Sequence, residues 1–342
     1  MKKEQKVLIV GQLIVILFLL CAVGFLWDKK IQMTRHNASE EPNAVSEGSF
    51  LAEKQQKTDT TDGNLFKEEG VTGNQSSGIA VLSTAEQAIL QEDVVIDLKQ
   101  DGVKPLSGKN IVVFGDSIWN TYRSPTGIAY QVAKETGATI YNCAINGTRA
   151  STDDETVDVM NNWHSKSLST MIYIMMGIID PVDQIKGEYA IRVVDKIDWD
   201  TVDYVLISYG IQDYLFNARL ESEEGDYYGL NTYMGALRHA ALRLHERYPN
   251  IKILFLAPTY CDIWVGPEDC TTHDEGHGTL LDYVEAMNIA AVQTDSSFLN
   301  MYEQMGISAV NAMDYMEDSI FLNEKAREKY AEIVTESLIK MK

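Results

Sequence analysis

Short apolar runs alternate with longer amphipathic runs from Lys109 to the end of the chain. The apolar runs are rich in β-branched residues and are bounded by turn-forming residues, which is typical of buried strands. We expect strands at residues 111–114, 139–144, 202–208 and 251–256, and a short fifth strand around 298–299. We expect helices at residues 127–135, 231–247, 280–293 and 323–339. This alternation predicts an α/β domain over residues 109–342, with a parallel five-stranded sheet between two helical layers.

The first hundred residues follow a different pattern. Residues 7–27 form an almost unbroken apolar run, and about 20 apolar residues are enough to span a bilayer as a helix. We therefore expect one transmembrane anchor with residues 1–6 in the cytoplasm, even though the basic residues on its two sides are nearly balanced. A cleaved signal peptide is the alternative, because Ala22-Val23-Gly24 has the small residues that signal peptidase accepts.

Residues 28–80 are rich in polar and charged residues, with Phe50 and Phe66 as their only aromatics. Such a segment cannot bury enough apolar area to offset the entropy lost on ordering it. We expect a disordered tether here, followed by a lead-in segment at residues 81–108. A single N-terminal anchor then predicts a single-pass protein of the cell membrane whose folded domain lies outside the cytoplasm.

The formal net charge of −21 narrows the choice of partners. A polyanion would be repelled, and few basic clusters are present to release its counterions, so the sequence argues against nucleic acid. No phosphate-binding loop, dinucleotide fingerprint or dense cluster of metal ligands is visible, so we expect neither a cofactor nor a metal. The oligomeric state is not predicted.

Two cysteines lie close together in a polar loop of the expected domain. Cys261 and Cys270 are nine residues apart, and in an oxidising compartment they could close this loop as a disulfide. A zinc site is the weaker alternative, because only two sulfurs are present and His273 and His277 lack a familiar spacing to them. We therefore predict the disulfide.

Four segments that could carry chemistry follow predicted strands or precede the last helix. Ser117 comes directly after the first strand, where it can act as a nucleophile or simply cap the next helix. Gly147 follows the second strand and can offer its N–H to an oxyanion, although alone it is better explained as a simple loop glycine. Gln212 follows the third strand, and Asp318 precedes the last helix. Ligands of parallel α/β sheets bind beyond the carboxyl ends of the strands, so these residues should share one pocket.

The order of these segments resembles the four blocks of the SGNH (GDSL) hydrolases, namely Gly-Asp-Ser, a glycine, Gly-x-Asn-Asp and Asp-x-x-His. The resemblance covers roughly residues 109–342 and implies a three-layer, flavodoxin-like fold and serine ester hydrolysis. Further stretches look like a membrane-anchored subgroup in Gram-positive bacteria, at residues 208–214, 232–238, 257–261 and 278–283. By resemblance, Ser117 is the nucleophile, the oxyanion hole consists of Ser117, Gly147 and Gln212, and Asp318 orients a histidine.

Two positions depart from the family pattern. Gln212 stands where the family has Asn, which keeps the amide donor but moves it by one methylene. Phe321 stands where the family has its histidine, and a benzene ring can neither accept the serine proton nor return it to a leaving group. His273 and His277, in the loop after the fourth strand, are the candidates for a substitute base, and two solvated loop histidines are the alternative.

Three functions therefore stay open. The domain is an esterase acting on acyl groups of a cell-surface glycan or another acylated small substrate, a non-catalytic relative that binds an acylated glycan or a partner, or an acyltransferase for cell-surface polymers. The first and third need a base, which Phe321 cannot supply. The sequence does not identify the substrate or establish whether the domain is an enzyme.

Overall fold

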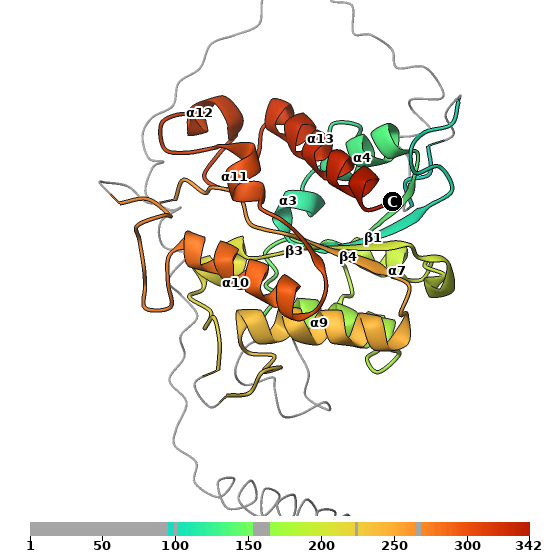
Figure 1. The fold of residues 1–342 in the computed structure, drawn as a ribbon, viewed down its shortest axis with the longest axis horizontal. Helices are drawn as coiled ribbons and strands as arrows, with labels where there is room; N and C mark the ends of the chain where they lie inside the picture. The colour runs from blue at the N-terminus through green and yellow to red at the C-terminus, as the bar shows by residue number, and fades with distance from the viewer. Residues whose placement is uncertain (1–94, 99–101, 153–164, 223–224, 264–267) are drawn as a thin grey trace, which may run out of the picture. The chain divides into compact units, whose positions relative to one another are not determined.

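Five parallel strands form one sheet at the centre of the computed structural model (Figure 1). The structure describes residues 95–98, 102–152, 165–222, 225–263 and 268–342. The spatial order is β2-β1-β3-β4-β5, and every neighbouring pair is parallel. The strands are β1 (Asn110–Gly115), β2 (Thr139–Asn142), β3 (Tyr204–Ser208), β4 (Lys252–Leu256) and β5 (Ser297–Leu299). The predicted α/β fold with a parallel five-stranded sheet is confirmed.

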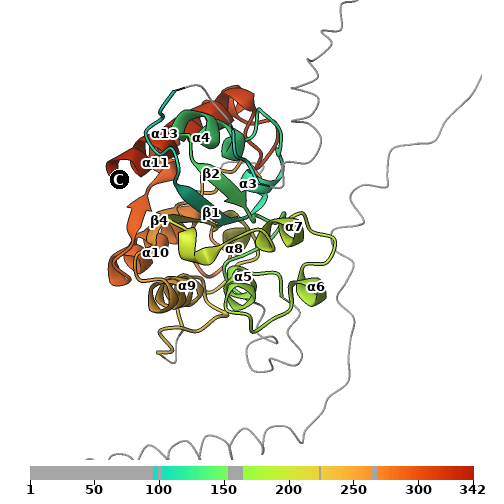
Figure 2. The same cartoon turned by 90° about the vertical axis from the view of Figure 1, so that its right-hand side faces the viewer.

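Helices cover both faces of this sheet (Figures 1 and 2). One face carries α4 (Ile128–Thr136) and α13 (Glu324–Lys340), which pack against each other, and the other carries α5 (Leu168–Met175), α9 (Tyr233–Arg247) and α10 (Leu280–Gln293). The shorter helices are α3 (Ser117–Asn120), α6 (Pro181–Gln184), α7 (Ala190–Val194), α8 (Ile211–Leu215), α11 (Met301–Met305) and α12 (Ala312–Tyr315), with a 3-10 turn at Trp199–Thr201.

The central strands are apolar along their whole length because both of their faces are covered. In β1, residues 111–114 are fully buried, and in β3 the same is true of residues 205–207. Strands buried on both faces have continuous apolar sequences, with no alternation of polar residues. This is why the sequence pattern located these strands to within a few residues.

Local signals fix the ends of the long helices. Gly137 ends α4 in the left-handed conformation, at a φ of 71°, where glycine avoids the strain that a Cβ would add. Asn323 begins α13 by accepting a hydrogen bond from Ala326 N at 3.0 Å. Thr279 and Asp282 form a reciprocal capping box at the start of α10.

Part of the expected lead-in segment belongs to the folded domain. Ile96 pairs in antiparallel fashion with Ile140 of the edge strand β2, through backbone hydrogen bonds of 3.0 and 2.9 Å. Leu106 is buried, and its N–H donates to Thr136 O. Covering an edge strand in this way satisfies backbone groups that would otherwise be exposed.

The predicted n-region, anchor and most of the tether and lead-in segment lie outside the described residues. This applies to residues 1–6, 7–27 and 28–80 and to 81–94 of the lead-in segment. Within the part that is described, no helix combines the length and apolar character needed to cross a bilayer.

The predicted disulfide is wrong for this structure. Cys261 and Cys270 are free, fully buried thiols. Their side chains are hydrogen-bonded to each other, and this bond together with burial raises the pKa of Cys261. Backbone bonds hold the loop instead, including one from Leu280 N to Cys270 O at 2.9 Å. The spacing brought the sulfurs together, but it did not determine whether they bond covalently.

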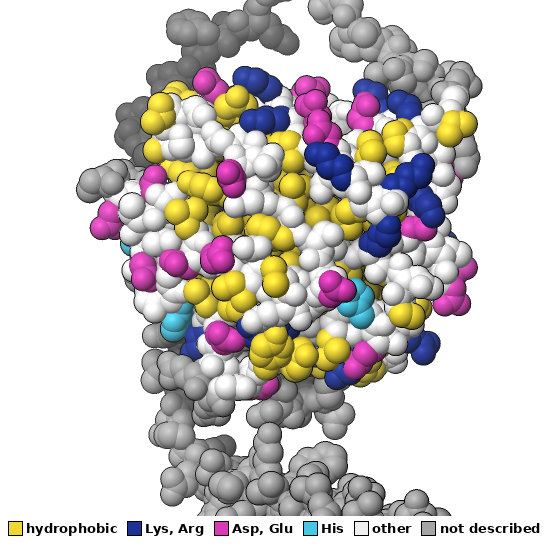
Figure 3. Space-filling view, viewed as in Figure 1, with side chains coloured by type: hydrophobic (Ala, Val, Ile, Leu, Met, Phe, Trp, Pro, Cys, Tyr) yellow, Lys and Arg dark blue, Asp and Glu magenta, His cyan; other side chains and the backbone are white. Residues whose placement is uncertain are grey.

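Charge is unevenly distributed over the surface. On the face shown in Figure 3, Lys and Arg side chains gather around α13 and the C-terminus, while Asp and Glu side chains predominate near α10. The net charge of −21 therefore does not describe every region of the domain. A local site has to be assessed from its own side chains.

Candidate active site

Ser117 lies at the carboxyl edge of the sheet, two residues after the end of β1, and Asp116 stands between them. Ser117 is the first residue of α3, and its side chain is almost fully buried. Asp116 caps this helix, because its Oδ1 accepts a hydrogen bond from Ile118 N at 3.0 Å. Gly115 suits the close packing here, since a Cβ would make a tight contact of 3.2 Å with Ser208 O of the neighbouring strand.

Asp116 is a buried carboxyl group beside the candidate nucleophile. Burial raises its pKa to about 7, against the opposing effect of the hydrogen bond from Ile118 N. A charged carboxylate here would disfavour negative charge on an acyl oxygen at Ser117, so the protonation of Asp116 affects what the site can hold.

Gly147 provides a hydrogen-bond donor to Ser117. Its N–H points at Ser117 Oγ, with an N–O distance of 2.9 Å. The φ of Gly147 is 68°, a left-handed conformation that glycine adopts without strain. The structure shows this bond to the serine oxygen itself, so the expected role of Gly147 as an oxyanion donor stays a prediction.

The loop that carries Gly147 is held by a buried carboxylate, Asp213 of α8. Its oxygens accept hydrogen bonds from Ala150 N at 2.9 Å, Ser151 N at 2.9 Å and Ser151 Oγ at 2.7 Å. Burial raises the pKa of Asp213, and these hydrogen bonds oppose the increase. No role for Asp213 was predicted from the sequence. The Gly-x-Gln-Asp segment contains it and could have identified it.

Gln212 precedes Asp213 on α8, and its side chain is nearly buried. The hydrogen bonds of Asp213 join α8 to the loop of Gly147, so Gln212 lies on a helix that contacts this loop. In the described structure its carboxamide makes no hydrogen bond to Ser117 or Gly147. Gln212 is thus near the expected oxyanion hole, but its role there stays a prediction.

Asp318 lies in an exposed turn, at residues 317–321, at the same edge of the sheet. Its Oδ1 accepts hydrogen bonds from Ile320 N and Phe321 N, both at 3.0 Å. Ser319 O accepts from Asp262 N, in the loop after β4, at 2.7 Å. The turn is thus joined to another carboxyl-end loop, as the resemblance requires.

A cluster of three side chains joins this turn to the loop after α3. Glu317 accepts a hydrogen bond from Tyr122 and forms an ion pair of 2.9 Å with Arg327. The Arg327 guanidinium is almost fully buried and lies 3.6 Å above the centroid of the Tyr122 ring. This cluster was not predicted, because Tyr122 is 195 residues from Glu317 in the chain.

Neither candidate histidine contacts Ser117. In the described residues, the only hydrogen bond to Ser117 Oγ comes from Gly147 N. The His273 ring lies between two carboxylates, Glu268 at 3.0 Å and Glu275 at 3.5 Å, and the bond to Glu268 is the main cause of its raised pKa. His277 lines a separate cavity with Arg149 and Phe216. The described residues also contain no group of His, Cys, Asp and Glu that could hold a metal ion.

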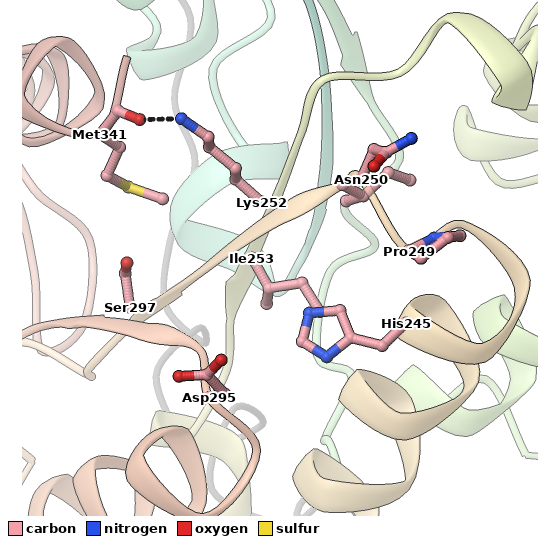
Figure 4. Close-up of a pocket in the computed structure, with 9 residues that line it drawn as sticks. His245, Pro249, Asn250, Lys252, Ile253, Asp295, Ser297 and Met341 are labelled. Atoms are coloured by element: carbon pink, nitrogen blue, oxygen red, sulfur yellow. Dashed lines mark hydrogen bonds between the residues drawn. The ribbon is translucent and has the colours of Figure 1, made fainter.

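A larger cavity, of about 450 Å³, lies at the opposite edge of the sheet (Figure 4). It includes Lys252 and Ser297, the first residues of β4 and β5, together with His245 and Asp295. Lys252 Nζ donates to Met341 O across it. Ligands of parallel α/β sheets bind beyond the carboxyl ends of the strands, so this cavity does not belong to the Ser117 site.

Comparison with solved structures supports the fold. A protein from Lactobacillus plantarum is 17% identical over 68% of this chain and 98% of its own, with a TM-score of 0.50. A lipase/acylhydrolase from Enterococcus faecalis is 13% identical over 68% of this chain and 96% of its own, with a TM-score of 0.41. At such low identity, the first likeness shows a shared fold and nothing about the substrate. No curated protein sequence matches the chain.

The sequence model of one protein family also matches. It describes the GDSL-like lipase/acylhydrolase family and spans residues 113–329, well over half of the chain. The matched segment contains Ser117, Gly147, Gln212 and Asp318. This chain therefore belongs to the GDSL-like lipase/acylhydrolase family.

Proposed function

We propose that this domain binds ester-linked acyl groups of a cell-surface glycan at Ser117 and hydrolyses them slowly. The hydrogen bond of 2.9 Å from Gly147 N to Ser117 Oγ carries this proposal. It joins a candidate nucleophile to a candidate oxyanion donor at the carboxyl edge of the sheet. An acyl carbon bonded to Ser117 Oγ would have its oxygen beside that N–H group, which favours ester chemistry.

The proposed reaction begins with attack of Ser117 Oγ on the acyl carbon, with the serine proton passing to water. The ester C–O bond then breaks, the glycan oxygen leaves with a proton from water, and a second water hydrolyses the acyl-serine to release the acid and restore Ser117. The N–H groups of Ser117 and Gly147 and the Gln212 carboxamide would stabilise the negative charge on the acyl oxygen. Phe321, at the position of the family's histidine, cannot take up the serine proton or protonate the leaving group. Enzymes that lose one triad member keep about a thousandfold to ten-thousandfold over water, so we expect slow turnover.

The proposed location rests on the sequence. An apolar run at residues 7–27 has the length of a membrane anchor, and the polar segment at 28–80 has the composition of a tether. A domain tethered outside the membrane would encounter esters on surface polymers. This is why we propose glycan-linked acyl groups as the substrate class.

A purely binding role is the second candidate, and the hydrogen bonds of Asp318 favour it. Its Oδ1 accepts two N–H groups of its own turn, and no histidine of the described residues contacts it. The carboxylate then stabilises the turn and takes no part in a proton relay. Such a domain would hold an acylated ligand at Ser117 without releasing the acyl group.

Restoring the histidine tests the proposal. The full-length chain in a neutral detergent should hydrolyse p-nitrophenyl acetate slowly, and Phe321→His should raise kcat/KM by about a hundredfold or more. Adding Ser117→Ala to that variant should remove the gain, because the two residues act as a unit. Ile320→His, which places the same ring one position away, is the matched control and should gain little.

Other results would lead elsewhere. Brisk hydrolysis by the unmodified chain that disappears in His273→Ala or His277→Ala would show that the loop supplies the base. Acetylated ligand binding without any gain from Phe321→His would favour the purely binding role. An activity that Ser117→Ala leaves unchanged would refute the assignment of the nucleophile.

A further inference from the structure

A second, smaller cavity is lined by residues of the two elements that carry Gly147 and Gln212. It has a volume of about 230 Å³, and its walls include Arg149, two residues after Gly147, and Phe216, directly after α8. The Gly147 loop and α8 are the two elements that Asp213 joins. A ligand that reaches from Ser117 along the loop therefore arrives at this cavity.

Two arginines and a histidine contribute to the wall of the cavity. Arg149, Arg219 and His277 all line it, in a chain whose net charge is −21. Arg219 is exposed, and none of the described carboxylates pairs with it. The nearest buried carboxylate, Asp213, already accepts hydrogen bonds from Ala150 and Ser151. The cavity is thus a local cationic site on an acidic domain.

Thr152 is an independent sign that the cavity takes a ligand. It lines the cavity and is only 3% exposed, and its Oγ1 has no hydrogen-bond partner among the described residues. Its N–H is already bonded to Leu230 O at 2.8 Å. Buried hydroxyl groups nearly always find a partner. The Oγ1 atom is covered in the structure, so a rotation of the Thr152 side chain would bring it to a ligand oxygen in the cavity.

Phe216 adds an apolar surface beside the charges. Its ring is 57% exposed, and the Arg149 guanidinium lies 5.2 Å from the ring centroid. A sugar ring can pack on an exposed aromatic face while its acidic substituent meets the guanidinium groups. Arginine is well suited to this, because its planar fork matches the oxygens of carboxylate and phosphate groups.

We propose that this cavity binds the oxyanion group, a carboxylate or a phosphate, of an acidic glycan whose ester lies at Ser117. The inference rests on the proposed function and specifies the substrate class: an acylated anionic polymer. Arg219 would pair with the anion, Thr152 would donate its hydroxyl, and Phe216 would support the ring.

Calorimetric titration of the full-length chain in neutral detergent tests this with three probes. They are an O-acetylated galacturonic acid trimer, an O-acetylated galactose trimer as its neutral match, and an acetylated galactose 6-phosphate. The acidic trimer or the phosphate should bind about tenfold or more tightly than the neutral trimer, because charge-assisted hydrogen bonds are the strong ones. Whichever of the acidic trimer and the phosphate binds more tightly shows whether the cavity prefers a carboxylate or a phosphate.

Three variants show which residues produce the preference for acidic ligands. Arg219→Gln should remove most of the preference, and Thr152→Val, which keeps the shape but not the hydroxyl, should weaken anion binding severalfold. Lys134→Gln removes the same charge from an exposed position on α4 and should change nothing. Thermal unfolding should show that Arg219→Gln, an exposed substitution, leaves the fold intact.

Equal affinity for the acidic and neutral trimers, or an Arg219→Gln effect no larger than that of Lys134→Gln, would overturn the inference. Failure of the proposed function has a different signature. In that case the unacetylated acidic trimer would bind as tightly as the acetylated one, and Ser117→Ala would not alter either affinity. The anion site would then stand while the acyl-ester assignment would fall.

Discussion

Replacing Asp116 by asparagine should change how the stability of the domain depends on pH. Asp116 is 3% exposed, and burial raises its pKa from 3.8 to about 7. Asparagine keeps an oxygen to accept the hydrogen bond from Ile118 N, at 3.0 Å in the native chain. It removes only the charge, so the comparison isolates the cost of ionising a buried carboxyl group.

The direction in which stability changes with pH follows from proton binding to Asp116. Between pH 4 and pH 7 the folded chain holds a proton on Asp116 that the unfolded chain has released, so stability falls as pH rises through that window. Each unit of difference between the folded and unfolded pKa corresponds to about 1.4 kcal/mol. The shift of Asp116 from 3.8 to about 7 therefore lowers the free energy of unfolding by about 4 kcal/mol above pH 7. We expect Asp116→Asn to be about 2–4 kcal/mol more stable than the native chain at pH 8, and nearly equal to it at pH 4.

Urea unfolding followed by circular dichroism, at several pH values from 4 to 8.5, measures this difference. Asp180→Asn is the matched control, since Asp180 caps α6 in the same manner, through Val182 N at 2.8 Å, but is exposed. The free energy of unfolding of Asp180→Asn, plotted against pH, should run parallel to that of the native chain. If Asp116→Asn is also parallel, burial does not raise the Asp116 pKa and the reasoning fails.

Three further substitutions test the supports of the site by urea unfolding. Asp213→Asn should lower the free energy of unfolding by about 2–4 kcal/mol, because the new amide NH₂ would face a backbone N–H that donates to the carboxylate in the native chain. A decrease below about 0.5 kcal/mol would count against this. Gly147→Ala should cost about 1 kcal/mol from its φ of 68° alone, since a Cβ there meets nothing within 4 Å. Arg327→Met should cost about 3 kcal/mol, because Thr126 O and Leu322 O lose their donor; an unchanged midpoint would contradict that.

The sequence predicted most of the sheet because its strands are buried on both faces. Residues 111–114 were expected as a strand, and β1 spans Asn110–Gly115. α5 was missed, and its sequence explains why. Leu168–Met175 has buried residues on several sides of the helix, so the polar face that gives amphipathic helices their period of 3.6 residues is lacking.

The supports of the site could not be predicted from spacing. Asp213 and Ala150 are 63 residues apart, and Arg327 reaches Thr126 over 201 residues. Such partners are determined by packing, which brings loops from different strands together. His273 is different, because its glutamate partners, Glu268 and Glu275, are only five and two residues away in the sequence.

The hydrogen bonds that hold the turn before α13 also determine what the variant Phe321→His can reveal. The turn at residues 317–321 is bonded to Tyr122, Arg327 and the loop after β4, none of which depends on the ring at position 321. A histidine introduced there would start from a backbone that is already fixed on both sides. Because Asp318 is anchored to the N–H of residue 321, an imidazole at that position begins close to its expected partner. A failure to gain activity would then indicate a change in the pocket itself, at Gln212 or around Ser117, since the turn holds its position without the ring.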